Sequence, residues 1–159
     1  MKTETTLSAL RPRMQNPAEI IPDAVQPIQA LIAAAYKGGV PPATLAHLRI
    51  SQINGCAQCI DGGAKHAKQD GETDERLFAV AAWREAPYFT PAERAALALA
   101  ESVTRLSDRP DPVSDEVWNE ATRHYDEKAM AGLLLSIATV NVFNRLNVST
   151  RQIAGAQTW

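Results

Sequence analysis

Apolar residues recur along this chain with the three- and four-residue spacing of helices that bury one face, from about residue 16 onwards. No segment shows the sustained alternation of Val, Ile and aromatic residues with polar ones that marks a half-buried strand. The pattern therefore predicts an all-α fold. A length of 159 residues is usual for one domain, so we expect residues 1–159 to form a single helical domain.

Glycines, prolines and capping residues mark where these helices begin and end. Gly38-Gly39 and Asn54-Gly55 are typical helix stops, and Pro22 and Pro27 limit what precedes the first long apolar run to short pieces. The clearest start is Thr90-Pro91-Ala92-Glu93, which has the form of a capping box. We expect helices over residues 28–36, 41–53, 56–69, 74–84, 91–106, 115–124 and 127–147.

The last of these segments is apolar on almost every side, whereas the tail beyond Asn147 is polar and ends in Trp159. A helix that is apolar all round is buried, either in the centre of a domain or in a subunit interface. Its apolar residues include Met130, Leu133, Leu134, Leu135, Ile137, Ala138, Val140 and Val142.

Charge and length exclude several classes of partner. The formal net charge is -2, and Lys and Arg are scattered, so no basic patch exists to neutralise nucleic-acid phosphates. No segment approaches the roughly 20 consecutive apolar residues that span a bilayer, and no apolar leader follows the first basic residues. We expect a cytoplasmic protein that binds neither nucleic acid nor a membrane.

The chain has only two cysteines, Cys56 and Cys59, and they follow Gly55 at the start of a predicted helix. At a helix N-terminus, unpaired backbone N–H groups and the positive end of the helix dipole favour the thiolate. One helical turn separates the two residues, so their sulfurs can form a disulfide with little backbone movement. This is the minimum equipment for two-electron thiol chemistry, in which one thiolate attacks and the other resolves.

Two other interpretations of the cysteine pair stay open. In the first, the cysteine pair is half of a tetrahedral zinc site, whose two further ligands would have to come from His47, His66, His124 or carboxylates. Alternatively, both cysteines are inert core residues, since free cysteine is among the most buried residue types. A thioredoxin-like motif is excluded because it needs a βαβ setting.

The residues around the pair extend the signal well beyond the two cysteines. The string S-Q-I-N-G-C-x-x-C-I-D covers residues 51–61, and further matching segments lie at 71–73, 83–85, 89–97 and, faintly, 141–146. Across about residues 42–148 the chain resembles the AhpD-like branch of the alkyl hydroperoxidase and carboxymuconolactone decarboxylase superfamily. Residues 1–15 and 148–159 lie outside the resemblance.

This resemblance implies an AhpD-like helical fold, assembly into homotrimers or hexamers, and an alkyl hydroperoxide reductase activity. Such a peroxidase reduces hydroperoxides without haem, flavin or metal and takes electrons from an external thiol or dithiol. In the family the second cysteine attacks the peroxide and the first resolves. Carried onto this chain, Cys59 attacks, and Cys56 resolves and is the more exposed to the external reductant.

The chain departs from the family at the groups that activate the thiol. The family places a glutamate twelve residues before the first cysteine and a histidine four residues after the second, where this chain has Thr44 and Gly63. If the helices before and after Asn54-Gly55 form an antiparallel hairpin, His47 lies opposite residues 60–63, where Gly63 leaves room for a ring. We therefore hypothesise that His47, with His66 behind it, supplies the missing base.

Each histidine also has a simpler interpretation. His47 would then be a surface residue on the outer face of its helix, and His66 part of a solvated helix end. The same dithiol also suits a disulfide reductase, and two other functions remain as alternatives to thiol peroxidase or disulfide reductase chemistry. One is a lactone decarboxylase of the same superfamily, a branch that does not use a cysteine pair. The other is a non-enzymatic module whose dithiol senses redox state or controls assembly.

Overall fold

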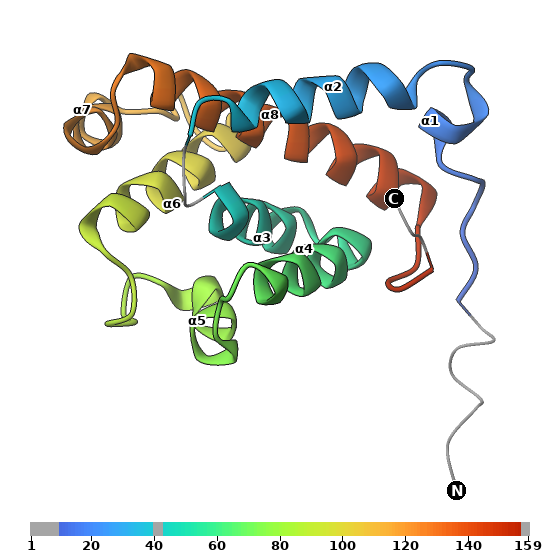
Figure 1. Cartoon of the computed structure of the whole chain (residues 1–159), viewed down its shortest axis with the longest axis horizontal. Helices are drawn as coiled ribbons and strands as arrows, with labels where there is room; N and C mark the ends of the chain where they lie inside the picture. The colour runs from blue at the N-terminus through green and yellow to red at the C-terminus, as the bar shows by residue number, and fades with distance from the viewer. Residues whose placement is uncertain (1–9, 40–42, 157–159) are drawn as a thin grey trace, which may run out of the picture.

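The computed structural model describes residues 10–39 and 43–156, and in these ranges the fold is all-helical, as the sequence predicts. Figure 1 shows α2 lying along α8, α3 and α4 side by side below them in this view, and α6 and α7 at one end. The elements are α1 (Pro17–Ile20), α2 (Val25–Tyr36), α3 (Ala43–Asn54), α4 (Ala57–Gln69), α5 (Asp74–Ala79), the short 3-10 helix η2 (Val80–Ala82), α6 (Pro91–Thr104), α7 (Asp115–His124) and α8 (Glu127–Thr150).

Most helix starts follow the predicted capping residues. The side chain of Thr90 accepts a hydrogen bond from the N–H of Glu93, and the Glu93 carboxylate accepts one from the N–H of Thr90, which completes the capping box. Asp126 caps α8 in the same local way, through the N–H of Ala129. Because side-chain caps satisfy N–H groups that the helix cannot, they fix helix starts that sequence can locate.

Several predicted ends are wrong by a few residues. Helix α2 begins at Val25 rather than at residue 28, since Pro27 lies within its first turn, where a proline costs no hydrogen bond. Helix α5 ends at Ala79 and continues only as η2, short of the predicted residue 84, and α6 ends at Thr104. Helix α8 runs past Asn147 to Thr150. The predicted start at Pro41 or Pro42 and the terminal Trp159 lie outside the described residues.

Helix α3 lies at the centre because its buried apolar residues belong to two separate hydrophobic clusters. One cluster joins α3 to α6, α7 and α8, and the other joins α3 to α4, α5 and α6. Burial on two sides fixes the position of α3, and with it the helix that follows the Asn54-Gly55 turn. The first cluster includes Ala46, Ile50, Leu99, Leu133 and Ile137; the second includes Leu45, Leu48, Leu77, Val80 and Leu97.

Helix α8 packs against α2, α3 and α6, yet it is not buried on every side. Leu135, Val142 and Val148 are each about 40 % exposed. By length and composition α8 is also the one helix in the described part of the chain that could cross a membrane. Its packing between other helices is the arrangement of a core helix that keeps one apolar face uncovered.

The end of α2 meets α8 through glycines. A Cβ atom built on Gly132 would lie 2.8 Å from both the Ala35 carbonyl oxygen and the Gly38 Cα. Side chains at this crossing would therefore push the two backbones apart. Glycine here sets how closely α2 lies on α8, and so how it covers the site described next.

Candidate functional site

The two cysteines form a disulfide at the start of α4. Cys56 is the N-cap of the helix, the Cα atoms of Cys56 and Cys59 are 5.3 Å apart, and Cys56 Sγ accepts a hydrogen bond from the Cys59 N–H at 3.3 Å. Gly55 precedes the pair with a φ of 68°, a left-handed conformation that glycine adopts without strain. Cys56 is at the predicted N-cap position, and the Cα separation of the two cysteines is in the range that a disulfide spans, as predicted.

The exposure of the two cysteines is the reverse of the expected one. In this disulfide form Cys56 is 1 % exposed and Cys59 is 8 % exposed. Cys56 lies under the turn at Gly55 and the end of α8, and it borders a hollow of about 290 Å³ that Ala57, Arg151 and residues of α8 also line. The expectation that Cys56 is the more exposed cysteine is therefore wrong for the oxidised protein.

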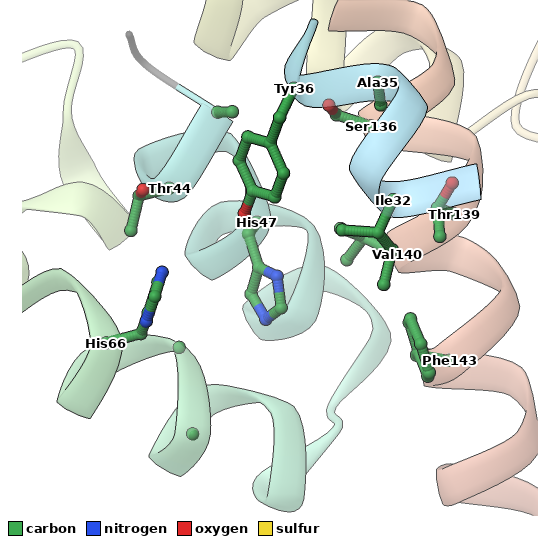
Figure 2. Close-up of a pocket in the computed structure, with 13 residues that line it drawn as sticks. Ile32, Ala35, Tyr36, Thr44, His47, His66, Ser136, Thr139, Val140 and Phe143 are labelled. Atoms are coloured by element: carbon green, nitrogen blue, oxygen red, sulfur yellow. The ribbon is translucent and has the colours of Figure 1, made fainter. Parts of the chain in front are cut away.

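Cys59 borders a different and larger cavity, of about 420 Å³, between α2, α3, α4 and α8. An adjoining hollow of about 170 Å³ extends it toward Tyr36 and Thr44. Figure 2 shows apolar side chains of α2 and α8 on one side of this space, and His47 and His66 on the other. The residues that line the larger cavity are Gln29, Ile32, His47, Gln58, Cys59, Gly62, Gly63, His66, Phe143 and Asn147.

His47 reaches this cavity from α3 and lies against Gly63 of α4. A Cβ atom on Gly63 would lie 2.8 Å from His47 Cδ2, so the absence of a side chain there is what admits the ring. His47 Nε2 is 3.3 Å from the Cys59 carbonyl oxygen. Because a carbonyl can only accept, this contact needs the hydrogen on Nε2 and leaves Nδ1 as the acceptor. The predicted hairpin placement is confirmed, and the outer-face interpretation of His47 is wrong.

A residue that the sequence did not single out contacts the cysteine pair directly. Asn147 of α8 is 5 % exposed, and its Nδ2 donates to Cys59 Sγ at 3.3 Å. Asn16, which is fully buried, in turn donates from Nδ2 to Asn147 Oδ1 at 2.7 Å. The signal in the sequence was the spacing of Asn141, Asn144 and Asn147, a polar row on an otherwise apolar helix.

Comparison with known proteins identifies the family. The model of the carboxymuconolactone decarboxylase family matches residues 22–102. The chain belongs to this family. It is also 38 % identical over 105 residues to the uncharacterised protein YdfG of Bacillus subtilis, a match that covers 66 % of this chain and 70 % of YdfG. A match to the uncharacterised YnjA of Escherichia coli, 35 % identical over 105 residues, covers 65 % of this chain but only 56 % of YnjA.

Solved structures show the same AhpD-like fold. The crystal structure of ATU0492 from Agrobacterium tumefaciens, a protein of unknown function proposed to be the antioxidant defence protein AhpD, superimposes with a TM-score of 0.84 and 28 % identity. That match covers 92 % of this chain and all of ATU0492. The crystal structure of the debrominase Bmp8 superimposes with a TM-score of 0.74 and 22 % identity, and the match covers 87 % of this chain and 74 % of the Bmp8 chain. At this identity the similarity shows the fold alone.

His66 lies at the rim of the cavity rather than against the sulfur of Cys59. Its side chain is 59 % exposed, and its Nε2 is 3.6 Å from Asp70 Oδ2 at the end of α4. His66 and His47 line the same cavity. The helix end around His66 is thus solvated, as its composition indicates, and His47 is the histidine that the fold brings to Cys59.

The position where the family has its relay glutamate holds Thr44, which lines only the smaller hollow. The buried carboxylate Glu101 is no substitute, because Arg49 and Arg84 hold it 2.7 and 2.8 Å from their guanidinium nitrogens. Burial raises the pKa of Glu101, but hydrogen bonds from Trp83, Arg49 and Arg84 outweigh it and lower that pKa overall. Among the described residues, no group of three or more His, Cys, Asp or Glu side chains is arranged to hold a metal ion.

The environment of His47 predicts a pH-dependent stability. Burial lowers the pKa of His47 below 6.5, the Cys59 carbonyl opposes this and nearby His66 adds to it. Below pH 6.5, therefore, His47 is protonated in the unfolded chain but stays neutral in the folded chain until the pH is lower still. The free energy of unfolding then falls as the pH falls. The loss is at most about 1.4 kcal/mol per pH unit.

We expect His47→Gln to remove this contribution in urea denaturation measured between about pH 7.5 and pH 5. The control is Gln69→Ala at the exposed end of α4, which removes no titratable group and for which the change in stability between the two pH values stays that of the parent. An unaltered pH dependence in His47→Gln would show that His47 takes up its proton equally in both states.

Proposed function

We propose that this protein is a thiol-dependent peroxidase in which Cys59 attacks a hydroperoxide, Cys56 resolves, and an external dithiol restores the pair. One observation carries the proposal: Cys59 borders the cavity that His47 lines, whereas Cys56 borders a separate hollow. Substrate and reductant then approach the same disulfide from different sides. The family and the likeness to ATU0492 support the same chemistry.

The reaction balances with the two cysteines alone. The Cys59 thiolate attacks the distal oxygen of ROOH, the O–O bond breaks, and Cys59 becomes a sulfenic acid. The leaving alkoxide takes up the proton that the thiol has lost and departs as the alcohol ROH. Cys56 then attacks the Cys59 sulfur, an S–S bond forms and water leaves. Two thiol–disulfide exchanges with an external dithiol return both cysteines to the reduced state and leave the reductant oxidised.

His47 is the base that this site offers, and we assign it the removal of the proton from the attacking thiol or the approaching peroxide. A lowered pKa keeps its imidazole neutral at pH 7, which is the form a base requires. Its Nδ1 is the free acceptor in the tautomer described above. His66, at the cavity rim, would pass that proton on to solvent.

The cavity favours hydroperoxides with an apolar group. Ile32, Val140 and Phe143 line the space next to the histidines, while Gly62 adds no side chain on the α4 side. A small alkyl or aryl group could bury its surface there, with the peroxide directed at Cys59. No haem, flavin or metal enters this mechanism.

The remaining assignments are part of the same proposal. We place the protein in the cytoplasm, where thiol reductants are available. The exposed Leu135, Val142 and Val148 of α8 support a homo-oligomer, a trimer or hexamer. The intact cysteine pair argues against a lactone decarboxylase, and the cavity beside Cys59 argues against a module that only senses redox state.

A turnover assay tests the proposed function. With dithiothreitol as electron donor, we expect the protein to consume cumene hydroperoxide and release the alcohol, many equivalents per chain. Protein whose thiols have been blocked with iodoacetamide is the control and should be inactive. If the disulfide is reduced and reformed by small disulfides while peroxide is not consumed above the control rate, the protein is a disulfide reductase and the peroxidase proposal is wrong.

A further inference from the structure

A chain of buried hydrogen bonds leads from the first turn of α1 to the sulfur of Cys59. The Ala18 N–H donates to Asn16 Oδ1 at 2.9 Å. Asn16 Nδ2 donates to Asn147 Oδ1 at 2.7 Å, and Asn147 Nδ2 donates to Cys59 Sγ at 3.3 Å. The second of these hydrogen bonds joins residues that are 131 positions apart in the sequence, and the third joins residues that are 88 positions apart.

The first link determines the direction of every later one. A backbone N–H can only donate, so Asn16 must turn its carbonyl oxygen to Ala18, and its NH₂ group then faces Asn147. Asn147 must meet that donor with its own oxygen, which leaves its NH₂ group toward Cys59. A hydrogen-bond donor at the sulfur is therefore imposed by the backbone of α1, and an amide flip at Asn147 would break two bonds.

We propose that Asn147 is the hydrogen-bond donor that stabilises the Cys59 thiolate, and that Asn16 is the positioning residue that holds Asn147 in its donating orientation. The assignment of Cys59 as the attacking residue rests on the proposed function. Asn147 lies at the reacting atom itself, whereas Asn16 acts only through Asn147.

Hydrogen bonds to the charged form of a group stabilise that form, so a fixed donor lowers the pKa of the Cys59 thiol. Such bonds to charged groups are worth more than neutral ones, and their worth rises where water is excluded. Asn16 is fully buried and Asn147 is 5 % exposed, so water competes little for either amide. This donor would provide part of the thiolate stabilisation in a chain that lacks the family's glutamate and histidine at Thr44 and Gly63.

Titratable and charged groups around the pair also act on the Cys59 thiol. His47 from α3 and His66 from α4 line the Cys59 cavity, and Arg151 after α8 lines the Cys56 hollow. The start of α4 itself contributes its N–H groups. Because these groups stay in place when only Asn147 is changed, their contribution to the thiol pKa is common to all the variants compared below.

The test is the pH profile of Cys59 alkylation by iodoacetamide, measured in a Cys56→Ser background so that one thiol titrates. Serine is a preferred N-cap, so this background keeps the start of α4. At pH values below the thiol pKa, we expect Asn147→Ala to slow alkylation about tenfold. Asn147→Asp should slow it further, because an acceptor-only carboxylate then faces the thiolate.

The order of the two variants separates a donor from a packing role. Asp keeps the shape of Asn147 and Ala does not, so a residue that only fills space would make Asn147→Ala the worse variant. The matched control is Asn144→Ala, one turn earlier on α8, where the buried amide bonds to Ser51 and Asn54 instead of the cysteines. It should leave the pH profile unchanged.

A variant at Asn16 tests the positioning role. Ser in its place can still cap Ala18 but is too short to hold Asn147, so Asn16→Ser should raise the pKa of the Cys59 thiol by less than Asn147→Ala does. Coincident pH profiles for the parent and both Asn147 variants, folded by circular dichroism, would overturn the inference. Alkylation needs no peroxide, so its result stands even if peroxide turnover fails and the proposed function is withdrawn.

Discussion

Cys59→Ser is expected to reduce the rate of peroxide consumption by a factor of roughly 10³ or more, the scale on which removal of a nucleophile acts. The reason is geometric as well as chemical: Cys59 is the cysteine at the cavity, and Cys56 is 1 % exposed on the other side of the pair. Without an external thiol, Cys56→Ser should instead react once and stop, since its sulfenic acid has no partner thiol in the chain.

Mass spectrometry after a single mixing with peroxide distinguishes these outcomes. Cys56→Ser should gain one oxygen atom at Cys59, which dimedone traps, whereas Cys59→Ser should gain none at Cys56. Both variants keep a residue that fits the start of α4, so circular dichroism serves as the folding control. Oxidation of Cys56 in the Cys59→Ser protein at the parent's rate would reverse the assigned roles of the two cysteines.

Gly132→Ala is expected to lower the free energy of unfolding by about 1–3 kcal/mol, the usual cost of an extra methyl group in a closely packed position. Its Cβ would lie 2.8 Å from the Ala35 carbonyl oxygen, and a backbone atom cannot rotate away as a side chain can. The shift would also lift α2, which contributes Gln29 and Ile32 to the Cys59 cavity. Peroxide turnover should therefore fall together with stability.

Gly62→Ala is the matched control for this change. Gly62 is exposed in the middle of α4, and a Cβ atom there would meet nothing within 4 Å. Alanine is the better helix former, so this variant should gain up to about 1 kcal/mol in urea denaturation. Equal stability changes in the two variants would mean that α2 does not lie as close to α8 as Gly38 and Gly132 indicate.

The parts of this molecule that the sequence predicts are those set by neighbouring residues. The Asn54-Gly55 turn dictates an antiparallel hairpin of α3 and α4, and that hairpin alone places His47 beside Gly63. The N-cap position of Cys56 likewise follows from the glycine before it. These features depend on contacts within about one hairpin, and local patterns carry the information for them.

The parts that the sequence misses depend on partners far along the chain. Helix α8 continues past its predicted end at Asn147 to Thr150, whose carbonyl accepts the Arg13 N–H at 2.8 Å. The segment before α1 that contains Arg13 also brings Asn16 to Asn147. No local spacing predicts that a residue near the N-terminus sets the environment of Cys59, because the contact exists only once α8 has been placed on α3.

The prediction that Cys56 is the more exposed of the two cysteines was wrong for a related reason. The resemblance to the family predicts the roles of Cys56 and Cys59, but it contains nothing about which neighbours cover each sulfur. In this chain the turn at Gly55 and the last turn of α8 close over Cys56, and α2 leaves Cys59 beside a cavity. In the proposed mechanism, an external reductant that attacks Cys56 would enter through the hollow that Arg151 lines.

The central claim is that this dithiol reduces a hydroperoxide directly, and single-turnover mixing tests it most directly. Protein that has been reduced and freed of reductant is mixed with one equivalent of cumene hydroperoxide in a stopped-flow instrument. We predict that one alcohol forms and one Cys56–Cys59 disulfide appears per chain, with a rate constant well above that of a free thiol at the same pH. A rate constant equal to that of the free thiol would contradict the account.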